Sequence, residues 1–323
     1  MTTSDLPLLS ICIPTYNRSV KLDYFLVALA AALNGISETV EIIISDNCST
    51  DDTYKVAAAF VKNDPRVQLL RQEENIGAEG NFWFLWGHAA GKYVWIIGDD
   101  DLLEVNALLD VLAELKNDPD LLIINYSNWD SDLASQLSCS AYPEMPAAFG
   151  DMEAIVKIFG PDLAFISMSV LRHDLVKNIT AENYRKLSVT GLSFMFGLYS
   201  CMRTSVKIRF LPTPVIRNRQ ALNVSYNWDR YFVSGMAEVF QALQQEGYSS
   251  NATRLAKKRV VRRYIFPVFK LRKASGHLKF IHIFNAMRSY ADIPLSWLLI
   301  LPLAIVPSVM INTLDKLRKK IVS

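Results

Sequence analysis

Cysteine is scarce in this chain, and it forms no motif. The four cysteines among 323 residues are scattered, without a C-x-x-C pair. This spacing argues against a zinc site and a disulfide scaffold, and it favours a reducing compartment. The polar N-terminus runs directly into an apolar strand, so no signal peptide is expected. The length allows one large domain or two unequal ones.

Two common nucleotide-binding motifs are also missing. No G-x-G-x-x-G follows the first expected strand, and the sequence contains no Walker loop. A classical dinucleotide enzyme and a P-loop NTPase are therefore not expected.

Acidic residues are nearly absent from the C-terminal region. Residues 247–323 hold 15 Lys and Arg but only two acids, a formal charge of +13, while the first 246 residues carry a formal −11. Arg254, Lys258 and Arg262 would share one helical face, with the apolar Val261 and Ile265 among them. Such a helix can lie on an anionic membrane, with a solvated basic helix as the alternative. Nucleic acid is not expected, because no reading motif accompanies the charge.

Charge of either sign is missing from residues 293–314, a run just long enough to span a bilayer. A single crossing would conflict with the cations on both sides of the run, and Pro302 and Pro307 would break the helix. We therefore expect a peripheral or monotopic attachment, with a buried C-terminal hairpin as the alternative.

A regular pattern dominates the rest of the chain, in which apolar, β-rich runs alternate with helical periods. Strands are expected at residues 9–13, 40–45, 67–70, 93–97 and 121–125, and helices at 21–33, 53–61, 81–90 and 104–115. This alternation predicts an α/β fold with a mainly parallel sheet flanked by helices. Ligands bind beyond the carboxyl ends of such strands, where the polar residues 14–18, 46–47 and 99–101 should converge.

The run Gly98-Asp99-Asp100-Asp101 directly follows the apolar run 93–97. Adjacent carboxylates raise one another's cost of ionisation, and a hard divalent cation such as Mg²⁺ or Mn²⁺ relieves it. The alternative is an acidic turn in which Asp101 is the N-cap of a helix that begins near Leu102.

Four segments, in this order and spacing, resemble a family 2 glycosyltransferase of the GT-A fold, a Rossmann-like α/β architecture. They are Ile13-Pro-Thr-Tyr-Asn-Arg18, Ile44-Ser-Asp-Asn-Cys-Ser-Thr-Asp51, Asn75-Ile-Gly77 with Asn81, and Ala90-Gly-Lys-Tyr-Val-Trp-Ile-Ile-Gly-Asp-Asp-Asp101. The second, third and fourth segments look closer to the abequosyltransferase-like branch, which attaches sugars in bacterial O-antigen assembly. The resemblance covers residues 8–130 well and weakens toward 215.

The resemblance implies roles for the matching residues. The candidates for binding the nucleotide sugar are Pro14, Thr15, Tyr16, Asp46, Asn47, Asn75, Gly77, Asp99 and Asp100. Asp46 would read the edge of the base, and Asn75 with Gly77 would let backbone approach the nucleotide. Asp101 would contact the metal directly, with Asp100 near the ribose or the metal's waters. Gly98 replaces the first acid of the family's D-x-D-D form.

The family's acidic pair after the strand near the acceptor has no match, because residues 187–195 contain no acid. Weak candidates for the catalytic base are Asp130, Asp132, Asp162 and Glu182. Inversion or retention at the anomeric carbon stays open. The family's arginine before the third helix has only a loose substitute, Arg71.

These features predict a metal-dependent glycosyltransferase at the cytoplasmic face of a bacterial inner membrane. It would move a sugar, with a deoxyhexose as one candidate, from a nucleotide-diphosphate donor to a polyprenyl-diphosphate-linked oligosaccharide. Residues 1–215 would form the GT-A domain, with 1–103 binding the donor and 104–215 the acceptor, and 216–323 the helical membrane-association region. The alternatives are a catalytically silent nucleotide-sugar-binding or scaffold protein, and a sugar-1-phosphate nucleotidyltransferase, whose triphosphate loop is missing.

Overall fold

The computed structural model describes residues 6–176, 190–204, 207–220 and 228–307. The chain divides into two compact units. The first comprises residues 1–152, 163–184 and 197–223, and the second residues 153–162, 185–196 and 224–323. Because the two short segments 153–162 and 185–196 belong to the second unit, the units interleave along the chain.

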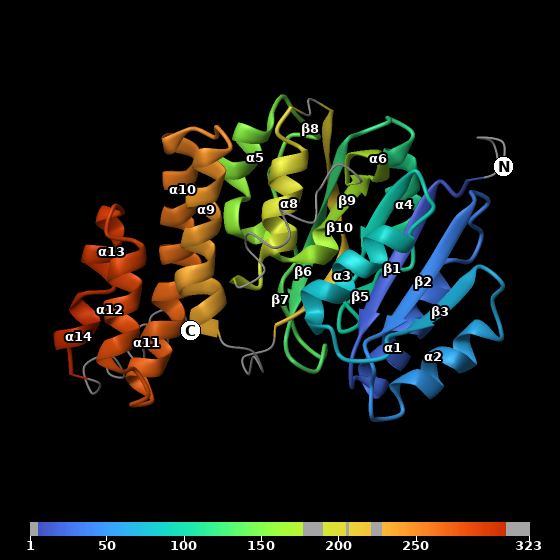
Figure 1. Cartoon of the computed structure of the whole chain (residues 1–323), viewed down its shortest axis with the longest axis horizontal. Coiled ribbons are helices and arrows are strands. Elements are labelled where there is room, and N and C mark those ends of the chain that lie inside the picture. The colour runs from blue at the N-terminus through green and yellow to red at the C-terminus, as the bar shows by residue number, and fades with distance from the viewer. Residues whose placement is uncertain (1–5, 177–189, 205–206, 221–227, 308–323) are drawn as a thin grey trace. The chain divides into compact units, whose positions relative to one another are not determined.

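The first unit is built on one sheet with strand order β3-β2-β1-β4-β9-β6-β10-β5 (Figure 1). Its donor-side strands are β1 (Leu9–Thr15), β2 (Val40–Asp46), β3 (Val67–Arg71) and β4 (Tyr93–Ile96). These four strands pair in parallel. Nearly every residue of β1, β2 and β4 is buried, which explains their continuous apolar sequences.

The second half of this sheet is mixed. It contains β6 (Leu121–Trp129), β9 (Ser169–Arg172) and β10 (Ile208–Arg219), with the short strands β5 (Leu102–Leu103), β7 (Gln136–Ser138) and β8 (Ala148–Phe149). β9 runs antiparallel to both β4 and β6, and β10 runs parallel to β6. The α/β fold with a mainly parallel sheet is thus confirmed.

The connecting helices lie close to where the sequence predicts them. They are α1 (Ser19–Ala32), α2 (Thr53–Val61), α3 (Gly77–His88) and α4 (Ala107–Leu115). The expected helix start near Leu102 is wrong, because Leu102 and Leu103 pair with Arg217 and Ile216 of β10. Asp101 is therefore not a helix N-cap.

The remaining helices are α5 (Met152–Ile158), α6 (His173–Val176), α8 (Ser193–Cys201), α9 (Met236–Gln245), α10 (Ser250–Val260), α11 (Phe266–Ala274), α12 (Phe280–Ser289), α13 (Pro294–Leu299) and α14 (Pro302–Ile305). Two π-helical segments, η4 (Asp229–Gly235) and η5 (Val261–Ile265), precede α9 and α11. Two 3₁₀ segments, η1 (Gly160–Ala164) and η2 (Ile166–Met168), lie before β9.

Among the described residues, no helix is long and apolar enough to cross a membrane. The helix break predicted at Pro302 is confirmed, since α13 ends at Leu299 and α14 begins at Pro302. The basic helix differs from expectation in one respect. Arg254, Lys258 and Arg262 are exposed, but Val261 and Ile265 are fully buried, so these two apolar residues pack inside the protein rather than facing lipid.

Candidate active site

The carboxyl ends of four parallel strands place polar residues side by side. In the strand registers, Thr15 is opposite Asp46, and Asp46 is opposite Arg71. The next strand, β4, leads into the acidic run through Gly98. We call this border, formed by the ends of β1 to β4 and the residues that follow them, the carboxyl edge.

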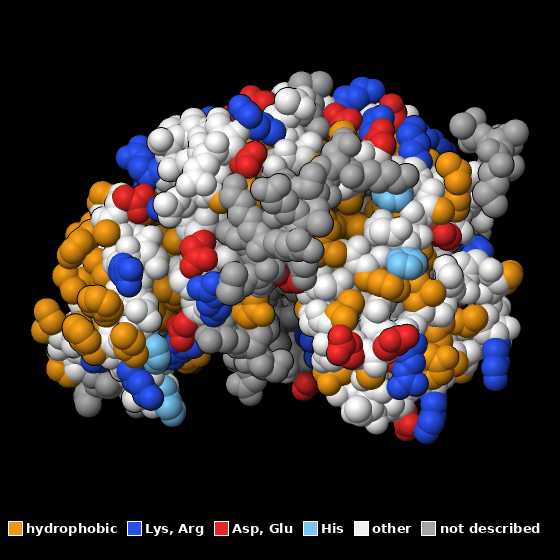
Figure 2. Space-filling view, viewed as in Figure 1, with side chains coloured by type: hydrophobic (Ala, Val, Ile, Leu, Met, Phe, Trp, Pro, Cys, Tyr) orange, Lys and Arg blue, Asp and Glu red, His pale blue; other side chains and the backbone are white. Residues whose placement is uncertain are grey.

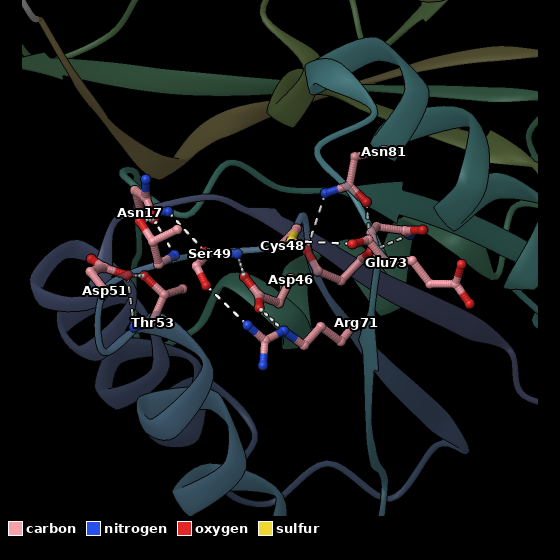
Figure 3. Close-up of polar contacts among 12 residues, drawn as sticks. Asn17, Asp46, Cys48, Ser49, Asp51, Thr53, Arg71, Glu73 and Asn81 are labelled. Carbon is pink, nitrogen blue, oxygen red and sulfur yellow. Dashed lines mark hydrogen bonds and ion pairs between the residues drawn. The ribbon is translucent and has the colours of Figure 1, made fainter.

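Asp46 is fully buried and incompletely hydrogen-bonded at this edge. One oxygen, Oδ1, accepts the backbone N–H of Ser49 at 3.1 Å. The other, Oδ2, has no hydrogen-bond donor, although Nε of Arg71 lies 3.4 Å away (Figure 3). Arg71 also donates to the carbonyl of Ser49 at 3.0 Å and stacks over the ring of Tyr54. A buried carboxylate oxygen without a donor is costly, so Asp46 has capacity to bind a ligand N–H.

Asn47 differs from Asp46, because both polar groups of its side chain make hydrogen bonds to other residues of the protein. Its Nδ2 donates to Oδ1 of Asn75 at 2.9 Å and to the carbonyl of Gly77 at 3.1 Å. Its Oδ1 accepts the N–H of Ile76 at 3.0 Å. Gly77 has φ +77°, a conformation that side chains with a Cβ disfavour. Asn47 therefore holds the Asn75–Gly77 turn in place. Asn81 is buried and ties α3 to Ser45 of β2.

Asp99 connects the acidic run to the first strand. Its carboxylate accepts the hydroxyl of Thr15 at 2.6 Å and Nη1 of Arg18 at 2.8 Å. Burial raises the pKa of Asp99 to about 6, although Arg18 and Thr15 favour its charged form. Arg18 also lies 2.9 Å from Asp100, and Lys21 lies 3.6 Å from Asp100.

Asp101 is buried and is held by two donors. Oδ2 accepts the hydroxyl of Ser167 at 2.7 Å, and a backbone N–H of Arg219 also bonds the carboxylate. Burial, followed by the charge of Asp100, holds the pKa of Asp101 well above the ordinary range of a carboxylic acid. Both donors are uncharged, so they stabilise the negative charge of the Asp101 carboxylate only in part.

The acidic run fits a divalent cation by its chemistry, since its carboxylate oxygens are the ligands that Mg²⁺ and Mn²⁺ prefer. The position that a Cβ on Gly98 would take lies 3.2 Å from Oδ1 of Asp100 and 3.3 Å from Oδ2 of Asp101. Two carboxylates can hold Mg²⁺ when substrate phosphates and water complete the shell. No group of three or more His, Cys, Asp or Glu in the described part of the chain is arranged to hold a metal by itself.

The sequence comparison with known families adds to this geometry. Residues 10–176, slightly more than half of the chain, match the family model described as glycosyl transferase family 2. The chain belongs to glycosyl transferase family 2. The matched residues include the whole carboxyl edge.

Curated relatives of this family 2 chain match it over a limited share of its length. Glycosyltransferase GlyG of Streptococcus pneumoniae is 31% identical over 38% of this chain and 40% of the relative. The abequosyltransferase RfbV of Salmonella typhimurium is 32% identical, over 39% of this chain and 38% of the relative. A Campylobacter jejuni GalNAc(5)-diNAcBac-PP-undecaprenol beta-1,3-glucosyltransferase is 36% identical over 34% of this chain and 35% of the relative. The matches thus span at most about two fifths of these relatives.

Solved structures similar to this chain share the GT-A-like fold at low sequence identity. The crystal structure of S. aureus TarS has a TM-score of 0.60 and 16% identity, covering 89% of this chain and 49% of TarS. A shorter TarS structure, in complex with UDP-GlcNAc, has a TM-score of 0.58 and 15% identity, covering 88% of this chain and 80% of that one.

The last residues of β1 and the loop that follows differ in how far their side chains are exposed. Thr15 is buried, whereas Tyr16 is 40% exposed and Pro14 is partly exposed. Asn17 has φ 49°, and its Oδ1 accepts the N–H of Thr50 at 2.8 Å, which joins this loop to the segment after β2. Tyr16 is therefore the member of the predicted set whose ring is most open to a ligand.

The candidates for a catalytic base fall in different environments. Asp130 caps the turn after β6 by accepting two backbone N–H groups, and Asp132 is exposed beside it. Asp162 is buried in the second unit and accepts bonds from Arg259, Arg263 and Tyr264, which indicates a structural role. Glu182 lies outside the described residues.

Two residues that contact the acidic run had no predicted role. Ser167 links Gly98 to Asp101, since it accepts the N–H of Gly98 at 2.9 Å and donates to Asp101. Arg219 donates to the carbonyl of Asp100 at 3.0 Å and to that of Ser131 at 2.5 Å. The turn that carries Asp130 and Asp132 is therefore tied to the acidic run. Arg71, which the resemblance offered only as a loose substitute for the family's arginine, ends the strand beside Asp46.

Proposed function

We propose that this family 2 chain is a glycosyltransferase that moves a sugar from a nucleotide-diphosphate donor to a lipid-linked oligosaccharide. The observation that carries the proposal is the carboxyl edge, where Asp46 at the end of β2 and the acidic run 99–101 after β4 lie on either side of β1. Complexes of the structural neighbour TarS with UDP and UDP-GlcNAc support the class of donor.

Asp46 would bind the base. Its Oδ2 lacks a hydrogen-bond donor, and the nearby Arg71 side chain is 48% exposed, so it can move to admit a base N–H. A carboxylate at this position favours a base with an imide N–H or an amino group. Tyr16 would lie against the base or ribose, and the turn held by Asn47 would present backbone to the nucleotide.

Asp101 and Asp100 would hold Mg²⁺ or Mn²⁺. When bound, the cation neutralises the charge that develops on the departing nucleotide diphosphate. Asp99 would hold its position through Thr15 and Arg18, and Asp100 would also lie near the ribose or the metal's waters. Ser167 and Arg219 orient the Asp101 carboxylate and the backbone of Asp100, so the two acids stay in place before the donor arrives.

The proposed acceptor is a polyprenyl-diphosphate-linked oligosaccharide of a bacterial surface polysaccharide. The names of two relatives support this class: one is an abequosyltransferase, and the other acts on a sugar chain linked to PP-undecaprenol. An acceptor fixed in the membrane makes peripheral attachment at the cytoplasmic face useful. The general base is left unassigned, with Asp130 and Asp132 as the candidates tied to the acidic run.

A donor screen tests this function. Purified full-length chain, Mn²⁺, a panel of nucleotide sugars and a polyprenyl-diphosphate-linked oligosaccharide should give a lengthened lipid-linked product with one donor. Tight binding of a nucleotide sugar without any product would indicate a silent binding protein instead. Pyrophosphate release from a nucleoside triphosphate and a sugar phosphate would indicate a nucleotidyltransferase.

A further inference from the structure

The helices α12, α13 and α14 of the second unit expose an unusual number of large apolar side chains. We call this set the apolar face: Phe280, Ile281, Phe284, Trp297, Leu298, Leu301 and Ile305. Phe280, Leu298 and Ile305 are 75%, 71% and 81% exposed. Figure 2 shows hydrophobic side chains gathered over these helices. Soluble monomers rarely leave a group of this size open to water, so the face points to a partner.

The helical geometry of α12 explains how the face forms. Phe280, Ile281 and Phe284 lie on the outer side of the helix, whereas Ile283 and Ala286 are buried on the other side. Tyr290, which follows α12, is fully buried and donates its hydroxyl to the carbonyl of Phe232 at 3.0 Å. The inner side therefore anchors α12, and its outer apolar residues are not needed for the core.

The charges near the apolar face indicate which kind of partner would bind it. Lys279 begins α12 and Arg288 lies in its last turn, and both are exposed. Between Phe266 and Pro307 the sequence has five Lys and Arg and a single acid, Asp292, which pairs with Lys257 at 3.1 Å. A second copy of this chain would bring the same cations toward each other, whereas an anionic bilayer offers the opposite charge.

We propose that the apolar face inserts into the interface of an anionic lipid bilayer, with Lys279 and Arg288 on the lipid head groups. Trp297 favours this depth, because tryptophan concentrates at membrane–water interfaces. The helices α13 and α14 are too short to span a bilayer, so they would lie in its surface. The proposal concerns how the protein attaches to a membrane. It assigns insertion to the apolar face instead of the basic helix α10, because the apolar side of that helix is buried.

Vesicle sedimentation tests the proposal with a matched pair of variants. The full-length chain should bind vesicles of phosphatidylethanolamine and phosphatidylglycerol much better than vesicles of phosphatidylcholine alone. The double change Phe280→Ser and Leu298→Ser should weaken binding at least about tenfold, because two large apolar side chains no longer insert. The control Val20→Ser with Val27→Ser alters side chains that are each 68% exposed on α1, and it should bind like the parent.

A separate double variant tests how much the two cations contribute to vesicle binding. Lys279→Gln with Arg288→Gln should weaken binding to the anionic vesicles by about 5-fold per cation and leave binding to phosphatidylcholine unchanged. Brominated lipids should quench the fluorescence of Trp297 in the unaltered chain, and Trp297→Phe should remove that quenching. The quenching is measured in the unaltered chain, so this test does not depend on a variant that could fail to fold.

Failure of this proposal can be told apart from failure of the proposed function. Absence of vesicle binding at low salt, or absence of Trp297 quenching, overturns the membrane assignment even if the chain transfers sugar. A concentration-dependent dimer that the Phe280 and Leu298 changes abolish would assign the face to a second copy instead. Vesicle binding without any nucleotide-sugar binding would leave the attachment intact and overturn the transferase.

Discussion

Aspartates lie close to both ends of strand β4, but in opposite electrostatic surroundings: Asp99 and Asp101 follow the strand, and Asp118, from the loop before β6, contacts its amino end. At the carboxyl edge, Asp99 and Asp101 are buried, and burial raises the pKa of both. At the other end, Asp118 accepts bonds from Lys92 at 2.8 Å and from the hydroxyl of Tyr93 at 2.9 Å, with Arg172 at 3.1 Å. There the Lys92 ammonium, with Tyr93 and Arg172, holds the pKa of the Asp118 carboxyl below its usual range.

The difference separates a structural from a functional use of the same residue type. Asp118 has enough cations around it to be stable as an anion, so it fastens the amino end of β4 to its neighbours. The carboxyl edge has more buried negative charge than the donors around it compensate. Such an imbalance persists where a ligand supplies the missing charge, which is the pattern expected of a binding site.

The largest effect is expected when Asp101 is replaced by Asn. Sugar transfer should fall by at least about a thousandfold, because the carboxylate that holds the cation is lost. The melting temperature should be unchanged or higher, since the folded-state pKa of Asp101 is raised and its charge therefore costs stability near neutral pH. Transfer assays and thermal unfolding check both outcomes.

Asp118→Asn is the matching change near the other end of β4, and we expect the opposite result. It should lower the folding stability and leave sugar transfer nearly intact. Loss of transfer in both variants, or a large drop in stability in the Asp101 variant, would contradict the comparison.

A smaller effect is expected from Gly98→Ala. The new methyl group would lie 3.2 Å from an oxygen of Asp100 and 3.3 Å from one of Asp101, so both carboxylates must shift by a few tenths of an ångström. Affinity for Mn²⁺ with nucleotide should drop about tenfold, as for other changes that disturb metal ligands. Titration calorimetry measures this affinity, and an unchanged value would show that the two oxygens do not share a cation.

Gly77→Ala tests the turn of the carboxyl edge. Its positive φ should make alanine cost about 1 kcal/mol of folding stability, and the shifted turn should weaken nucleotide binding. Gly87 of α3 is a matched control, because an added Cβ meets nothing within 4 Å at either glycine. Gly87→Ala should be neutral or stabilising by denaturant unfolding, since alanine favours the helix. Equal destabilisation of both variants would count against a special conformation at residue 77.

The smallest expected effect concerns stability against pH. Asp118 is 43% exposed, so solvent screening limits its contribution, and Asp118→Asn should cost only about 1 kcal/mol at neutral pH. Because the folded-state pKa of Asp118 is lowered, its stabilisation is present above pH 4 and is lost as the pH falls further. Urea unfolding at several pH values should therefore show the parent and the variant converging in acid; a gap that persists there would contradict the ion-pair explanation.

The donor half of the fold was largely predictable from sequence, because its signals are local. Continuous apolar runs mark β1, β2 and β4, and the expected helix 53–61 matches α2. The start of α4 was not predictable in this way. Leu102 and Leu103 pair with residues of β10 more than a hundred positions later, and this contact overrides the local helical pattern.

The candidate site likewise contains residues that local sequence signals predict and residues that only distant contacts bring into place. The strand-end motifs led to Asp46 and the acidic run, since each stands directly after an apolar strand. Ser167 and Arg219, which hold Asp101 and Asp100, come from distant segments without a motif of their own. The outward face of α12 was missed because the sequence does not tell which apolar residues of a short helix fill the core.

The central claim is that the acidic run binds a divalent cation together with the diphosphate of the donor. Electron paramagnetic resonance of Mn²⁺ measures this directly in the full-length chain. Addition of UDP should convert free Mn²⁺ into a bound species in the parent, and Asp101→Asn should abolish that species while Asp118→Asn retains it. An equal amount of bound Mn²⁺ in the parent and the Asp101 variant would contradict the account.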